Sequence, residues 1–179
     1  MKFFVLLILL FGMPKANAQN VYRTKEGHIE MMALVTGKTY KAESHKLALN
    51  LDYGSKVVNG VLDLKTLVTN NPIIKATLER QEEPLLIEFT GSVPSEDFLS
   101  RRHDPISFNW PIRVNYRDRS FKSNLKGTIT HIDQSMAMSC LISARGEIDA
   151  AGTGLDVLLK GIEGGLQIEF AQMVLKLDN

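Results

Sequence analysis

The sequence predicts an all-β protein, in which about eight antiparallel strands form a barrel accompanied by one short amphipathic helix. Apolar and polar residues alternate over segment after segment, as they do in strands with one buried and one hydrated face. Turn-forming residues separate these segments, and a helix-start signal interrupts them near the middle of the chain. A meander of such strands buries its apolar face and removes its exposed edges by closing on itself.

The clearest strands lie in residues 106–133. Residues 108–116 alternate strictly, the polar sequence Asp118-Arg119-Ser120 follows, and residues 121–131 alternate again. A short polar link between two such segments predicts an antiparallel β-hairpin.

The remaining predicted strands are less regular but share the two-residue period. They cover residues 29–35, 39–53, 57–67, 85–93, 136–144 and 166–177, with a weaker extended or irregular stretch at 148–160. In the last strand, Phe170 and Met173 belong to opposite phases. Because a one-residue slip exchanges the faces of a strand, we expect a β-bulge near Ala171 or Gln172.

The predicted helix follows the sequence Asn70-Asn71-Pro72. Asn before Pro at the first helical position is a helix-start signal, and residues 73–83 contain no further helix breaker. Ile74 and Leu78 fall on one face, so this segment is expected to be a short amphipathic helix.

Residues 1–18 have the features of a signal peptide. Lys2 precedes the apolar run 3–13, and Ala16-Asn17-Ala18 supplies small residues for cleavage. The run is about half of the ~20 residues that a membrane-spanning helix needs, so stable membrane insertion is not expected. The prediction is an exported protein, periplasmic or extracellular, whose residues 19–179 form one domain.

Composition excludes several classes of protein. Lys and Arg number 21 against 20 Asp and Glu, so no electrostatic attraction to nucleic acid or to an anionic membrane is expected. Cys140 is the single cysteine, which rules out an internal disulfide, and its place in an alternating segment predicts a small buried hydrophobe.

No catalytic or metal-binding motif is recognisable. The histidines His28, His45, His103 and His131 show no ligand-like spacing, so no metal site and no cofactor are expected. Serines occur outside any G-x-S-x-G turn, and a hydrolase would need a buried cluster of Ser, His and acid that the spacing does not suggest.

Several short motifs resemble the YceI-like family of small exported domains. Residues 24–30, Thr-Lys-Glu-Gly-His-Ile-Glu, resemble the start of that domain, and the helix at 73–83 followed by residues 83–91 resembles its helix and Pro-x-x-x-Phe-x-Gly strand. Residues 125–131 resemble its Gly-x-Leu-Thr-x-His-Gly strand, with Ile132 in place of the final Gly. Residues 94–105 lengthen a connection that is usually shorter. The resemblance implies a lipocalin-like barrel whose interior, in some members, holds a polyisoprenoid or similar lipid.

The predicted function is therefore that of an exported carrier for a hydrophobic or amphipathic small molecule, an isoprenoid-like lipid above all, without catalysis. Tyr116 or His131 would orient a polar head group. The interior is expected to be lined by Phe89, Phe108, Trp110, Ile112, Val114, Tyr116, Leu125, Ile129, His131, Met138 and Phe170. The alternative is a non-enzymatic envelope or interaction protein with the same barrel and a filled core. The sequence leaves open whether the protein forms a homodimer.

Overall fold

The computed structural model describes residues 21–94, 103–134, 137–155 and 161–177. The strands are β1 (Val21–Val35), β2 (Lys38–Asp52), β3 (Val57–Asp63), β4 (Val68–Thr69), β5 (Leu86–Ser92), β6 (His103–Tyr116), β7 (Arg119–Gln134), β8 (Ala137–Asp149) and β9 (Ile162–Leu177). The helices are α1 (Pro72–Glu79), α2 (Ala150–Thr153) and the 3-10 turn η1 (Leu64–Thr66). The signal peptide predicted at 1–18 lies outside the described residues.

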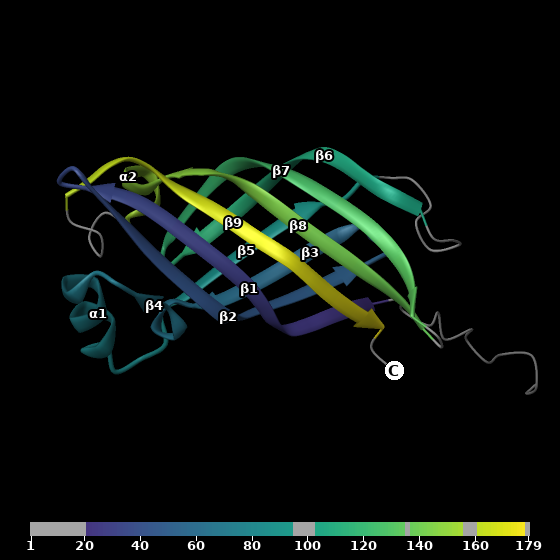
Figure 1. Cartoon of the computed structure of the whole chain (residues 1–179), viewed down its shortest axis with the longest axis horizontal. Coiled ribbons are helices and arrows are strands. Elements are labelled where there is room, and N and C mark those ends of the chain that lie inside the picture. The colour runs from purple at the N-terminus through teal and green to yellow at the C-terminus, as the bar shows by residue number, and fades with distance from the viewer. Residues whose placement is uncertain (1–20, 95–102, 135–136, 156–160, 178–179) are drawn as a thin grey trace, which may run out of the picture.

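Eight of the strands close into a barrel (Figure 1). They follow one another in the order β1-β9-β8-β7-β6-β5-β3-β2, and β2 returns to pair with β1. The pairings are antiparallel. The two-residue β4 is not part of the ring and pairs with β2. Because the ring leaves no long edge strand unpaired, the closed barrel expected from the sequence is confirmed.

The alternation along the strands separates the core from the surface. In the β6–β7 hairpin, Trp110 lies opposite Leu125 and both are buried, whereas Arg113 on the other face is exposed. The turn differs slightly from its prediction. It consists of Arg117 and Asp118, with a φ of 54° at Arg117, so that Arg119 already belongs to β7.

The predicted bulge in the last strand is confirmed. Phe170 of β9 pairs with Ala144 of β8, and Met173 pairs with Ile142, so β9 has one more residue than β8 across this interval. The extra residue changes the phase, and Phe170 and Met173 are therefore both buried.

Several predicted boundaries were wrong. The strand expected at 57–67 ends at Asp63, because the Asp63 side chain accepts hydrogen bonds from the backbone of Lys65 and Leu85 and starts η1. In the described part of the stretch expected to be extended or irregular after Ile148, β8 continues to Asp149 and α2 follows. The loop expected at 94–105 falls mostly outside the described residues, but its last three residues already belong to β6.

One end of the barrel carries the helices (Figure 1). α1 begins where predicted but ends at Glu79, four residues early. Ile74 and Leu78 are its buried residues, as the sequence indicated. In the described part of the chain, no helix is long and apolar enough to cross a membrane.

The Asn71 cap of α1 gives a testable prediction. Its side-chain oxygen accepts hydrogen bonds from the backbone N–H groups of Ile73 and Ile74 at 2.9 and 3.1 Å. We expect Asn71→Ala to lower the free energy of unfolding by about 1 kcal/mol, measured by urea denaturation. Asn71→Asp, which retains an acceptor, should cost less. Equal losses for the two variants would show that the cap is not the source of the effect.

Candidate ligand-binding interior

The structure places most of the predicted interior residues inside the barrel. Phe108 is only partly buried, and Met138 lies in β8 with a side chain outside the described part of the structure. The buried members are Phe89, Trp110, Ile112, Val114, Tyr116, Leu125, Ile129, His131 and Phe170.

An aromatic cluster fills the middle of the barrel. The ring of Phe89 stacks on that of Phe170, with 5.3 Å between centroids. It is nearly perpendicular to the ring of Trp110, with 6.1 Å between centroids. Trp110 also contacts Phe170 and Phe108, at 6.2 Å in each case. Such offset and edge-on arrangements add about 0.5–1.5 kcal/mol per pair beyond the area buried.

Glycines on the inner face make room for these rings. A Cβ placed on Gly60 would lie 2.1 Å from the Phe89 ring, and one on Gly127 would lie 2.7 Å from Phe108. At Gly91 the nearest atom would be the indole nitrogen of Trp110, at 2.5 Å. The space beside Gly91 and Gly127 is therefore occupied by aromatic side chains.

Between the described residues, this packed interior contains two small apolar cavities. One, of about 50 Å³, lies beneath α1 and is lined in part by Ile74 and Leu78. The other, of about 30 Å³, lies deeper among the barrel residues. Met31, Leu155 and Leu166 line both cavities and form the wall between them. A continuous layer of apolar side chains thus leads from the underside of α1 into the barrel.

Two polar atoms are buried among these apolar residues and have no hydrogen-bond partner within the described part of the chain. They are the indole Nε1 of Trp110 and the hydroxyl of Tyr116. Both side chains are almost completely shielded from solvent, with 0% and 3% exposed. A buried polar group left unpaired costs about 1–3 kcal/mol, so each of these groups would gain from an acceptor brought in by a ligand.

His131 has a different environment. Its Nε2 is hydrogen-bonded to the hydroxyl of Tyr53, and the edge of the Tyr22 ring faces it at 6.4 Å between centroids. β-sheet pairing places Cys140 opposite His131, and the Cys140 side chain lies near the Tyr53 hydroxyl. These residues belong to the barrel end opposite the helices, so Tyr116 and His131 do not form one site.

Burial dominates the acid–base properties of this cluster. It raises the pKa of the Cys140 thiol to about 12 and also raises the pKa of the Tyr53 hydroxyl. Cys140 is buried and free, as the sequence predicted, and its protonated thiol is a poor nucleophile at neutral pH.

These shifts predict a loss of stability at alkaline pH. The folded chain holds the Cys140 proton to about pH 12, whereas an unfolded chain releases it near the ordinary pKa of 9.0. The resulting stabilisation is complete below pH 9.0 and disappears as the pH rises toward 12. Chemical denaturation between these limits should show the decline. Cys140→Ala should make the decline of the free energy of unfolding with pH less steep by about 1.4 kcal/mol per pH unit. An unchanged slope would contradict the raised pKa of Cys140 as its cause.

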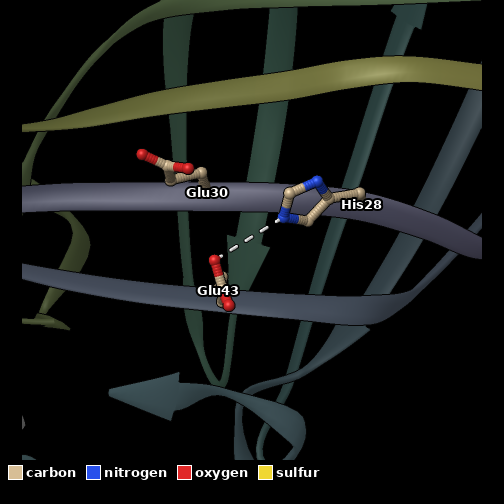
Figure 2. Close-up of side chains that lie close together, drawn as sticks. All are labelled: His28, Glu30 and Glu43. Atoms are coloured by element: carbon tan, nitrogen blue, oxygen red, sulfur yellow. Dashed lines mark ion pairs between the residues drawn. The ribbon is translucent and has the colours of Figure 1, made fainter. Parts of the chain in front are cut away.

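Sequence analysis missed a polar cluster on the outer surface of the barrel. Figure 2 shows His28 and Glu30 on one strand and Glu43 on the neighbouring strand, with His28 directed toward Glu43. The sequence signal was the pair of tripeptides His28-Ile29-Glu30 and Glu43-Ser44-His45, in which His and Glu occur in opposite order. Only the β1–β2 register shows that they meet, with Glu30 opposite Glu43.

A closed eight-stranded antiparallel barrel with a short helix at one end defines a lipocalin-like fold. No protein-family model and no curated protein matches the sequence. Among solved structures, the chain is similar to a polyisoprenoid-binding domain from Saccharophagus degradans implicated in plant cell wall breakdown. That likeness has a TM-score of 0.66 at 10% identity and covers 89% of this chain and 99% of that domain.

A second similar structure is BcnA of Burkholderia cenocepacia. Here the TM-score is 0.52 at 9% identity, over 85% of this chain and 96% of the other. At these identities the likeness shows the fold. The shared fold confirms the architecture implied by the resemblance to the YceI-like family.

Proposed function

We propose that the protein binds an elongated apolar or amphipathic lipid of the isoprenoid class inside its barrel and performs no chemistry on it. The observation that carries this proposal is the pair of buried polar atoms, Trp110 Nε1 and Tyr116 Oη, which have no hydrogen-bond partner among the described residues and lie within the hydrophobic core. A lipid with a polar oxygen would satisfy such atoms while its chain replaces apolar contacts. The solved domain from Saccharophagus degradans, described as polyisoprenoid-binding, supports the same ligand class.

The route of entry that we propose runs beneath α1. The cavity there is lined by Ile74 and Leu78 of the helix, and its inner wall is shared with the deeper cavity. Cavities of about 50 and 30 Å³ are too small for an isoprenoid chain, so binding requires the wall residues to move apart. Burial of the isoprenoid chain, at about 25 cal/mol per Å² of apolar surface, would supply the free energy for that rearrangement.

The site of action that we propose is the periplasm or the extracellular space. The leader-like residues 1–18 support this location. An exported binding protein of this kind would shield a poorly soluble lipid from water outside the cytoplasm.

A second candidate function rests on the small size of the cavities. A barrel filled by its own side chains at native density would serve as a rigid scaffold, and its loops would then carry the interactions. This alternative predicts that no lipid enters the interior under any conditions in which the barrel stays folded.

Native mass spectrometry distinguishes the two functions. The mature protein is purified from its own host, measured without denaturation, and then extracted with organic solvent. We expect a stoichiometric adduct whose mass is recovered in the extract as a lipid. A bare mass that stays bare after incubation with polyprenol and polyprenyl phosphate would contradict lipid binding and favour the scaffold.

The role of Tyr116 can be tested within the same experiment. Tyr116→Phe removes the unpartnered hydroxyl and keeps the ring. If this hydroxyl meets a polar head group, the variant should bind polyprenol more weakly than the wild type does but bind squalene, a hydrocarbon, equally well. Equal affinities of the two proteins for polyprenol would exclude that contact.

A further inference from the structure

The outer surface of β1 and β2 carries two tripeptides of complementary order. His28 and Glu30 are separated by Ile29, while Glu43 and His45 are separated by Ser44. Ile29 and Ser44 are buried, so their neighbours along each strand face outward. Antiparallel pairing sets Glu30 opposite Glu43 and brings the ring of His45 onto that of His28, with 4.3 Å between centroids.

The donor atoms of this cluster converge. One ligand atom each from His28, Glu30 and Glu43 lie within 4.8 Å of one another, and His28 Nε2 is 3.9 Å from Glu43 Oε2 (Figure 2). The side chains are partly buried, which restricts their conformations. His28 Nε2 is shielded from solvent and makes no hydrogen bond to any of the described residues, although an imidazole nitrogen normally has a partner.

The two carboxylates require a cation. Like charges directly opposite each other on neighbouring strands are destabilising, and here Lys41 compensates for them. Its Nζ lies 2.6 Å from Glu30 Oε2 and 3.2 Å from Glu43 Oε2. Lys41, whose flexible side chain can move away, thus holds the two carboxylates together. The neighbouring His28 Nε2 has no hydrogen bond to the described residues.

We propose that His28, Glu30 and Glu43 form a surface site for a divalent transition-metal ion, in the first place Zn²⁺, and that Lys41 is displaced when the ion binds. One imidazole and two carboxylates are a donor set suited to Zn²⁺, whereas Ca²⁺ requires six to eight oxygen ligands. Zn²⁺ is four-coordinate in most protein sites, so water or the adjacent His45 supplies the fourth ligand. This site is separate from the barrel interior.

Isothermal titration calorimetry with ZnCl₂ on the untagged full chain tests the proposal. We expect one site per chain in the wild type. His28→Ala should weaken binding at least tenfold, whereas Lys41→Met should strengthen it by removing the competing ammonium group. Glu88→Gln on β5 is the matched control for an exposed carboxylate elsewhere on the barrel and should leave binding unchanged.

A thermal melt of each variant with and without Zn²⁺ provides the second readout, because a ligand that binds the folded state raises Tm. Tighter Zn²⁺ binding by Lys41→Met cannot result from loss of folding. This variant therefore tests the site even if His28→Ala does not fold. Two results would overturn the proposal. One is the absence of saturable Zn²⁺ binding by the wild type. The other is Zn²⁺ binding that neither His28→Ala nor Lys41→Met alters.

Discussion

Replacing Leu166 with alanine is expected to lower the free energy of unfolding by about 3 kcal/mol and, at the same time, to strengthen binding of an apolar lipid. Leu166 is buried and forms part of the wall between the two interior cavities. Removing a buried leucine side chain costs about 2–5 kcal/mol, because apolar contacts are lost and a cavity remains. Here the new cavity would join the two existing ones and create space along the proposed route of entry.

The two effects should be linked. An apolar cavity stays dry and accepts apolar molecules, so added polyprenol should restore the stability that Leu166→Ala loses. At a free ligand concentration of 100 times Kd the gain is about 2.7 kcal/mol. Chemical denaturation with and without polyprenol measures both quantities.

Leu175→Ala is the matched control for this prediction. Leu175 is also buried on the inner face of β9, but it pairs with Cys140 near the opposite end of the barrel and lines neither cavity. Its replacement should cost a similar amount of stability without improving binding of polyprenol. If both variants bound polyprenol equally, the proposed route beneath α1 would be wrong. If neither bound it, a filled scaffold would be the better account.

Trp110→Ala should produce the largest loss of stability of any single substitution considered. Trp110 is completely buried and contacts Phe89, Phe108 and Phe170 at the centre of the aromatic cluster. Its truncation should lower the free energy of unfolding by about 3–5 kcal/mol. For a chain of this size that corresponds to a fall in Tm of roughly 10 °C, which differential scanning calorimetry can measure.

Trp110→Phe separates the packing of the ring from the indole N–H. Because Nε1 has no hydrogen-bond partner, its removal breaks no hydrogen bond and leaves an aromatic ring against Phe89 and Phe170. We therefore expect Trp110→Phe to cost clearly less than Trp110→Ala. Equal costs would mean that the N–H group has a partner that stabilises the fold.

Local sequence signals predicted the parts of the fold that depend on neighbouring residues. Strict alternation in β6 and β7 predicted their pairing and their inner faces, because strand geometry alone determines which side chains share a face. The phase change between Phe170 and Met173 predicted the bulge, and Asn71-Pro72 predicted the start of α1.

The errors occurred where contacts between distant segments decide the structure. The strand β3 ends at Asp63 because its carboxylate accepts a hydrogen bond from the backbone of Leu85, which is far away in sequence. The packing of the Phe108 ring against Gly127 of the neighbouring strand likewise depends on the β6–β7 register. The approach of His28 to Glu43 depends on the register of β1 and β2, which alternation alone does not determine.

The central claim, that a lipid occupies the barrel interior, is tested most directly by the fluorescence of Trp110. It is the only tryptophan of the chain and lies completely buried among the interior aromatic residues, so its emission reports on that region alone. The protein is titrated with a polyprenol carrying a short-range spin-label quencher on its chain. Lipid binding in the interior predicts saturable quenching with one ligand per protein. Unquenched Trp110 emission at concentrations where native mass spectrometry detects bound polyprenol would place the ligand elsewhere and contradict the claim.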